Sequence, residues 1–97
     1  MVNHVTLINC FEVPAGSEDR FVERWQQAAD YLRQREGFIS TQLHQSLDPA
    51  AAFRFINVAK WESAEHFQQA ISEPGFRGLA GEMPFSSHPA LYRLIRE

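Results

Sequence analysis

Two stretches of the chain alternate between apolar and polar residues, as strands do when one of their faces is buried. One face of the first stretch, residues 3–13, carries Val5, Leu7, Asn9, Phe11 and Val13. One face of the second stretch, residues 52–61, carries Phe53, Phe55, Asn57, Ala59 and Trp61. Each row has one polar member, and burying an amide without a partner costs about 1–3 kcal/mol. Asn9 and Asn57 are therefore either satisfied by backbone or water, or held ready for a ligand.

Between and after these stretches, apolar residues recur at helical spacing. A first helix is expected over residues 18–36, with Ser17 as its N-cap and Gly37 as its left-handed stop. A second helix is expected after Ser63 and is interrupted at Pro74, with a short further turn of helix beyond it. The remaining segments predict strands over residues 38–47 and 90–95 and a loop over residues 83–89.

The resulting β-α-β-β-α-β order predicts a ferredoxin-like α+β fold with one antiparallel sheet. Right-handed crossovers place both helices on one sheet face. The first and third strands are then antiparallel neighbours, so Asn9 and Asn57 can line one cavity between sheet and helices. A length of 97 residues predicts one domain, residues 1–97.

The opposite face of the predicted sheet is also apolar. It carries Ile8 and Cys10 on the first strand, Ile56 and Val58 on the third, and apolar residues of the last strand. A sheet that is apolar on both faces needs cover on both. A second copy of the chain is the simplest cover, which predicts a homodimer.

Composition and charge narrow the function classes. The net charge of −3 and the scattered Lys and Arg residues argue against a nucleic-acid partner. No apolar run is long enough to span a membrane, and the N-terminus lacks the pattern of a signal peptide. Cys10 is the only cysteine, which favours a reducing, cytoplasmic setting. No pair of histidines has metal-motif spacing, and no Gly-rich dinucleotide fingerprint is present, so no metal or nicotinamide cofactor is expected.

The string from Asn57 to Ser63, Asn-Val-Ala-Lys-Trp-Glu-Ser, followed by Phe67, resembles the strand-to-helix signature of the antibiotic biosynthesis monooxygenase (ABM) domain. The resemblance extends from Val5 to Ile95. It implies a dimeric α+β barrel in which two ferredoxin-like protomers pack sheet to sheet. Members of the family include enzymes that oxidise phenolic rings with O₂ and no metal or flavin, related quinol monooxygenases, and haem-degrading monooxygenases.

The resemblance carries over only part of each known active site. From the phenol-oxidising enzymes it implies Asn57 and Trp61, but their tyrosine falls on Phe67 and their arginine falls near Ala80, with Arg77 in the vicinity. From the haem-degrading enzymes it implies the first-strand Asn9.

The catalytic tryptophan of the haem-degrading enzymes falls near Ala70, and their iron-ligating histidine falls near Ala80. His88, in the predicted loop, is the best substitute ligand that the sequence offers.

The leading hypothesis is a small oxygenase that uses O₂, without bound metal or flavin, on a phenolic, quinol or polycyclic aromatic substrate. Asn57 would donate to a phenolate oxygen, Asn9 would bind a carbonyl or O₂-derived oxygen, and Trp61 would pack on the ring. The expected substrate-binding residues are Phe11, Phe67, Phe76 and Arg77. One alternative is a haem-binding or haem-degrading monooxygenase. The other is a non-catalytic dimeric module that binds a small aromatic molecule or haem without turning it over, which the absence of the family's tyrosine, arginine and histidine favours.

Overall fold

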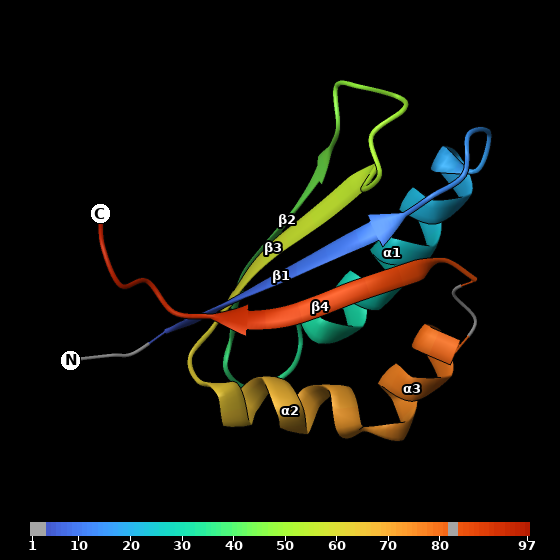
Figure 1. Ribbon diagram of the computed structural model, residues 1–97. Coiled ribbons are helices and arrows are strands. Elements are labelled where there is room, and N and C mark those ends of the chain that lie inside the picture. The colour runs from blue at the N-terminus through green and yellow to red at the C-terminus, as the bar shows by residue number, and fades with distance from the viewer. Residues whose placement is uncertain (1–3, 82–83) are drawn as a thin grey trace.

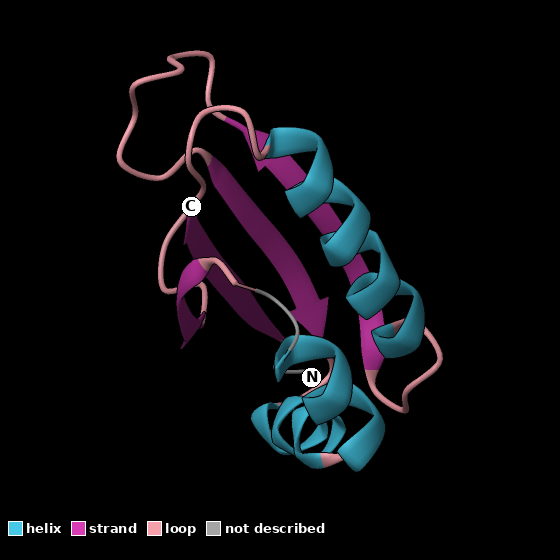
Figure 2. Ribbon diagram, turned by 90° about the vertical axis from the view of Figure 1, so that its right-hand side faces the viewer, coloured by secondary structure: helices cyan, strands magenta, loops and turns pink. Residues whose placement is uncertain are grey.

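The computed structural model describes residues 4–81 and 84–97. Its elements are β1 (Val5–Glu12), α1 (Glu18–Leu32), β2 (Phe38–Gln45), β3 (Phe55–Trp61), α2 (Ala64–Ser72), α3 (Pro74–Gly81) and β4 (Ser86–Tyr92). The strands form one antiparallel sheet in the order β2-β3-β1-β4, and the helices lie on one side of it (Figures 1 and 2). The predicted ferredoxin-like α+β fold is confirmed.

The two ends of α1 differ from the sequence prediction. The Ser17 side chain makes no capping hydrogen bond; instead, the Gly16 N–H donates to Glu18 Oε1 at 2.8 Å. Hydrogen bonds from the backbone N–H groups of Glu18 and Gly16 to this carboxylate, more than the nearby Arg54, lower the pKa of Glu18. The helix ends at Leu32 rather than at residue 36, because the N–H groups of Gln34 and Arg35 bond to carbonyls three residues back, those of Tyr31 and Leu32, in a turn that precedes Gly37.

Gly37 has the predicted left-handed conformation, with φ +87°. It also lies against α2, since a Cβ atom added at this position would clash with the ring of His66. Ser63 caps α2 as predicted, because its side chain accepts the His66 N–H at 3.1 Å. The turn before β2 is thus packed onto the start of α2.

Several strand boundaries differ from the prediction, most of all those of β4, which was predicted over residues 90–95. β2 ends at Gln45 and β3 begins at Phe55, because an Asp48-centred turn, with the Ala50 N–H donating to Asp48 Oδ1 at 2.9 Å, takes up the chain between them. β4 spans Ser86–Tyr92, so residues 86–89 are strand rather than loop.

Pro89 made that segment look irregular. It lies opposite Asn9 in β4, which is an edge strand, and edge strands tolerate proline.

The core between sheet and helices falls into two clusters. One contains Leu7, Ala59, Trp61, Phe67 and Ala70. The other contains Phe11, Phe21 and Phe55, with the Phe21 ring centroid 4.8 Å from that of Phe11 and 4.7 Å from that of Phe55. In the β1–β3 register, the pair Asn9 and Asn57 lies between Leu7–Ala59 and Phe11–Phe55. The two amides therefore occupy the gap between the clusters.

Candidate functional site

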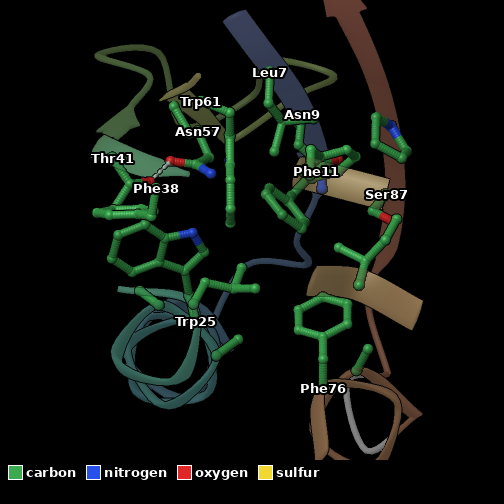
Figure 3. Close-up of a pocket in the computed structure, with 18 of the residues that line it drawn as sticks. Leu7, Asn9, Phe11, Trp25, Phe38, Thr41, Asn57, Trp61, Phe76 and Ser87 are labelled. Atoms are coloured by element: carbon green, nitrogen blue, oxygen red, sulfur yellow. Dashed lines mark hydrogen bonds between the residues drawn. The ribbon is translucent and has the colours of Figure 1, made fainter. Parts of the chain in front are cut away.

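A cavity of about 270 Å³ lies between the sheet and the helices. All strands and helices named above contribute to its wall. Its described lining is apolar or aromatic except for four residues: Asn9, Thr41, Asn57 and Ser87. None of these lining residues is charged. In Figure 3 the sheet residues form one wall, while Trp25 and Phe76 reach toward it from α1 and α3.

Asn57 is the most buried of the four polar residues that line the cavity. Its side chain is 8% exposed, and its Oδ1 accepts a hydrogen bond from Thr41 Oγ1 at 2.6 Å. The amide nitrogen points toward the middle of the cavity (Figure 3). Within residues 4–81 and 84–97, Nδ2 of Asn57 has no acceptor.

Asn9 lies directly opposite Asn57 on the neighbouring strand and lines the same cavity. Its Oδ1 accepts the backbone N–H of His88 at 3.1 Å. A backbone N–H can only donate, so this contact fixes which amide atom is the oxygen. The predicted shared cavity is present. Both amide oxygens are hydrogen-bonded within the fold, while the two amide nitrogens have no partner among the described residues.

Trp61 is fully buried and lines the same cavity. Its ring packs edge-on against those of Phe38 and Phe67, with distances of 5.4 and 5.7 Å between ring centroids. The indole Nε1 is one of the buried side-chain nitrogens without a hydrogen-bond partner in the described part of the chain. A buried donor without a partner lowers the stability of the fold by about 1–3 kcal/mol. Trp61 therefore packs in the core and also carries an N–H without a described acceptor.

The remaining predicted substrate contacts divide into two groups. Phe11, Phe67 and Phe76 line the cavity. Arg77 does not: its side chain is exposed on α3, outside the described lining. Ala80, near which the resemblance would place a functional arginine or histidine, does line the cavity and brings no polar side-chain atom.

His88, the substitute iron ligand that the sequence offered, lies on the other face of the sheet and not in the cavity. It pairs with Cys10 across β1 and β4, while its neighbours Ser87 and Pro89 line the cavity. Its Nε2 lies 2.7 Å from Glu12 Oε2, and its ring packs against Phe53 at 5.3 Å. The strand conformation of residues 86–89 is the reason, because side chains alternate across a strand.

The cavity does not fit a ligated haem iron. Its described lining contains no histidine, cysteine, tyrosine or carboxylate. No group of three or more His, Cys, Asp or Glu side chains that could hold a metal ion occurs in the residues that the structure describes.

Sequence reasoning missed several lining residues, of which Trp25, Thr41 and Ser87 matter most. Trp25 belongs to the apolar stripe of α1, a pattern that core packing alone explains. Thr41 lies in a strand whose residues are polar on much of one face. Its register partner Ala59 shows that it faces inward, but sequence alone does not give that register.

The arrangement can bind a compact aromatic ring and direct amide donors at an oxygen on that ring. A family model for antibiotic biosynthesis monooxygenases matches residues 4–80. The chain belongs to this family. No match was found among the curated proteins.

Solved structures agree with this family assignment. A Shewanella loihica PV-4 protein, described provisionally as a monooxygenase, is 44% identical over 100% of this chain and 99% of its own, with a TM-score of 0.89. The cofactor-independent oxygenase SnoaB of Streptomyces nogalater shares the fold, with a TM-score of 0.87 at 24% identity over 98% and 96% of the two chains. A heme-degrading protein of Mycobacterium tuberculosis is 25% identical over 100% and 97%, with a TM-score of 0.76. Among the residues described for this ABM-family chain, no helix is long and apolar enough to cross a membrane.

Proposed function

We propose that this ABM-family protein is an oxygenase that oxidises a phenolic, quinol or polycyclic aromatic substrate with O₂, without a bound metal or flavin. The observation that carries the proposal is the pair of amide nitrogens of Asn9 and Asn57, unpartnered within the described chain, in an otherwise apolar cavity. Preorganised donors aimed at a developing oxyanion are worth most where water is excluded. The family relationship to SnoaB, described as a cofactor-independent oxygenase, supports the same chemistry.

In the proposed reaction the substrate is its own reductant. A phenolate passes one electron to O₂, and the resulting radical pair forms a C–O bond at a ring carbon that bears hydrogen. The peroxide then loses water and leaves a C=O group, so that one phenol and one O₂ give one quinone and one water. Asn57 would stabilise the phenolate oxygen, Asn9 would bind the peroxide or carbonyl oxygen, and Trp61 would pack on the ring.

The phenol proton leaves to water in this scheme. No ionisable side chain is among the described lining residues, so the cavity offers no general base. Substrates that ionise easily are therefore preferred.

The experiment is oxygen consumption by the purified protein with a panel of phenols and quinols, in parallel with haemin plus a reductant under air. Oxygen uptake with stoichiometric quinone formation supports the proposal. Ring-opening of haemin, with no phenol oxidised, would place the protein with the haem-degrading enzymes. An anaerobic control separates O₂ chemistry from simple binding.

The second candidate is a non-catalytic module that binds a small aromatic molecule. The absence of an ionisable side chain from the described lining favours it. Saturable binding of panel compounds without oxygen uptake would select this reading.

A homodimer is part of the proposal. The outer face of the sheet leaves Ile8, Ile56 and Val58 incompletely buried, and it continues into Tyr92, which is 52% exposed. A second copy packed sheet to sheet would cover this face. Light scattering at micromolar concentration should then give twice the 11.2 kDa chain mass. The protein's location is a further part of the proposal: the free Cys10 fits a reducing, cytoplasmic setting.

A further inference from the structure

The oxygen of each pocket amide is held by an edge strand of the sheet. Asn57 lies on β3, and its Oδ1 receives the hydroxyl of Thr41 from β2 at 2.6 Å. Asn9 lies on β1, and its Oδ1 receives the N–H of His88 from β4 at 3.1 Å. Because the strand order is β2-β3-β1-β4, these two holding groups lie on opposite sides of the central strand pair.

Because the holding groups lie on opposite sides, the two amide oxygens point away from each other. The two NH₂ groups therefore face the space between β3 and β1. Asn9 and Asn57 are register partners, and directly opposed residues have Cβ atoms about 4.5–5.5 Å apart. Neither amide nitrogen is among the buried unpartnered atoms of the described chain, so both remain open to the cavity. A single oxygen, or two neighbouring oxygens, can accept from both.

The orientation of the Asn9 amide is fixed by a backbone N–H donor, whereas the orientation of the Asn57 amide depends on a hydroxyl donor. Thr41 Oγ1 has one proton, and the Asn57 amide is its described partner. Without this proton the amide has no described group that holds its oxygen away from the cavity. Thr41 is half-buried in β2, paired with Ala59, so replacing it with an isosteric residue does not disturb the strand.

We infer that Thr41 is a positioning residue that turns the Asn57 amide, so that with Asn9 it forms a donor-only site selective for an acceptor oxygen, a carbonyl or a phenolate, on a neutral or singly anionic aromatic ring. The inference deepens the proposed function and rests on it only for the choice of an aromatic ligand. It can be tested without turnover.

The test measures binding of two matched probes to the full chain by chemical-shift titration. 1-Tetralone is an aryl ketone with one acceptor oxygen, and tetralin is the same bicyclic hydrocarbon without it. Wild type should bind 1-tetralone more tightly. Thr41→Val should raise the Kd for 1-tetralone by about 5–10-fold, the value of one hydrogen bond, and leave the Kd for tetralin within twofold.

Two further variants keep the inference falsifiable. Thr41→Ser restores a hydroxyl and should restore 1-tetralone binding. Thr6→Val is the matched control, because Thr6 lies on β1 with the opposite strand parity to Asn9 and removes a threonine hydroxyl from the outer face. It should change neither Kd.

A double variant separates positioning from direct contact. In the Asn57→Ala background, Thr41→Val should weaken 1-tetralone binding no further, because the amide that Thr41 positions is gone. Equal loss for both probes in Thr41→Val, no loss for 1-tetralone, or additive losses in the double variant would each overturn the inference. If every phenol fails to consume oxygen while the 1-tetralone result holds, the oxygenase proposal fails and the positioning role stands.

Discussion

The two faces of the sheet differ in whether the polar groups described above have a partner within the protein. On the inner face, the amide nitrogens of Asn9 and Asn57 and the indole nitrogen of Trp61 have no described protein acceptor. On the outer face, His88 and Glu12 pair at 2.7 Å. An uncommitted donor lowers stability, whereas an exposed pair costs little. The inner face thus presents donors without a described protein acceptor to an apolar cavity, whereas the outer face combines this exposed pair with incompletely buried apolar residues.

The largest effect should come from placing a charge on the outer face. Val58→Asp puts a carboxylate at the centre of the sheet, where a second copy would bury it unpaired. A buried charge without a partner costs about 3–5 kcal/mol, which weakens dimerisation by more than 100-fold. Light scattering should report the 11.2 kDa monomer.

Val22→Asp, on the exposed side of α1, should leave the mass unchanged and serves as the control for an added charge. A Val58→Asp protein that still has twice the chain mass would show that this face is not the interface.

The next effect tests the inner face. Asn57→Ala should slow turnover of an active phenol or quinol by about 10²–10³-fold, the usual loss for one preorganised donor. The fold should persist, because truncating the side chain removes an amide whose nitrogen has no described partner.

Gln42→Ala is the matched control, since Gln42 is an exposed amide side chain of β2 that pairs with Val58. Undiminished turnover in Asn57→Ala would return that amide to a structural role.

A smaller effect is expected at Trp61. Trp61→Phe removes part of a fully buried ring but also removes an orphaned N–H, so the two terms partly cancel. We expect the free energy of unfolding to fall by about 1–2 kcal/mol, measured by urea denaturation. If Trp61 only packs on the substrate ring, substrate affinity should fall more than the rate of the bound complex; the reverse order would indicate that its N–H acts in the reaction.

The smallest effect should be at His88. His88→Ala removes an exposed pair with Glu12 on the face away from the cavity, so turnover should stay within twofold. Haemin should give the same absorbance spectrum with the variant as with wild type. A Soret band that disappears in the variant would mean that the outer face takes part in ligand binding after all.

Much of the fold could be predicted because local patterns and strand parity agree. The alternation around Asn9 and Asn57 gives their shared face, and the element order gives the neighbouring strands. The errors lie where one residue type suits two structures. Proline marks loops, yet Pro89 is in an edge strand, so His88, which was predicted to lie in a loop, is held on the outer face of the sheet.

The candidate site was less predictable than the fold. Sequence identified both amides, but not which atom of each faces the cavity, since that depends on Thr41 and the His88 backbone. These contacts span 16 and 79 residues along the chain and follow from the sheet register. Arg77 had the right chemistry and the wrong helix face, which proximity in sequence cannot reveal.

Pro89 also affects which surfaces copies of the chain can use to associate. β4 forms one border of the sheet, and a proline there has no N–H to offer an incoming strand. Growth of the sheet by adding strands from other molecules at that border is therefore disfavoured. Copies that meet through the sheet surface stop at two, whereas copies that meet through borders can continue into fibres. The proline that made residues 86–89 look like a loop thus also makes the β4 border a poorer template for a strand from another molecule.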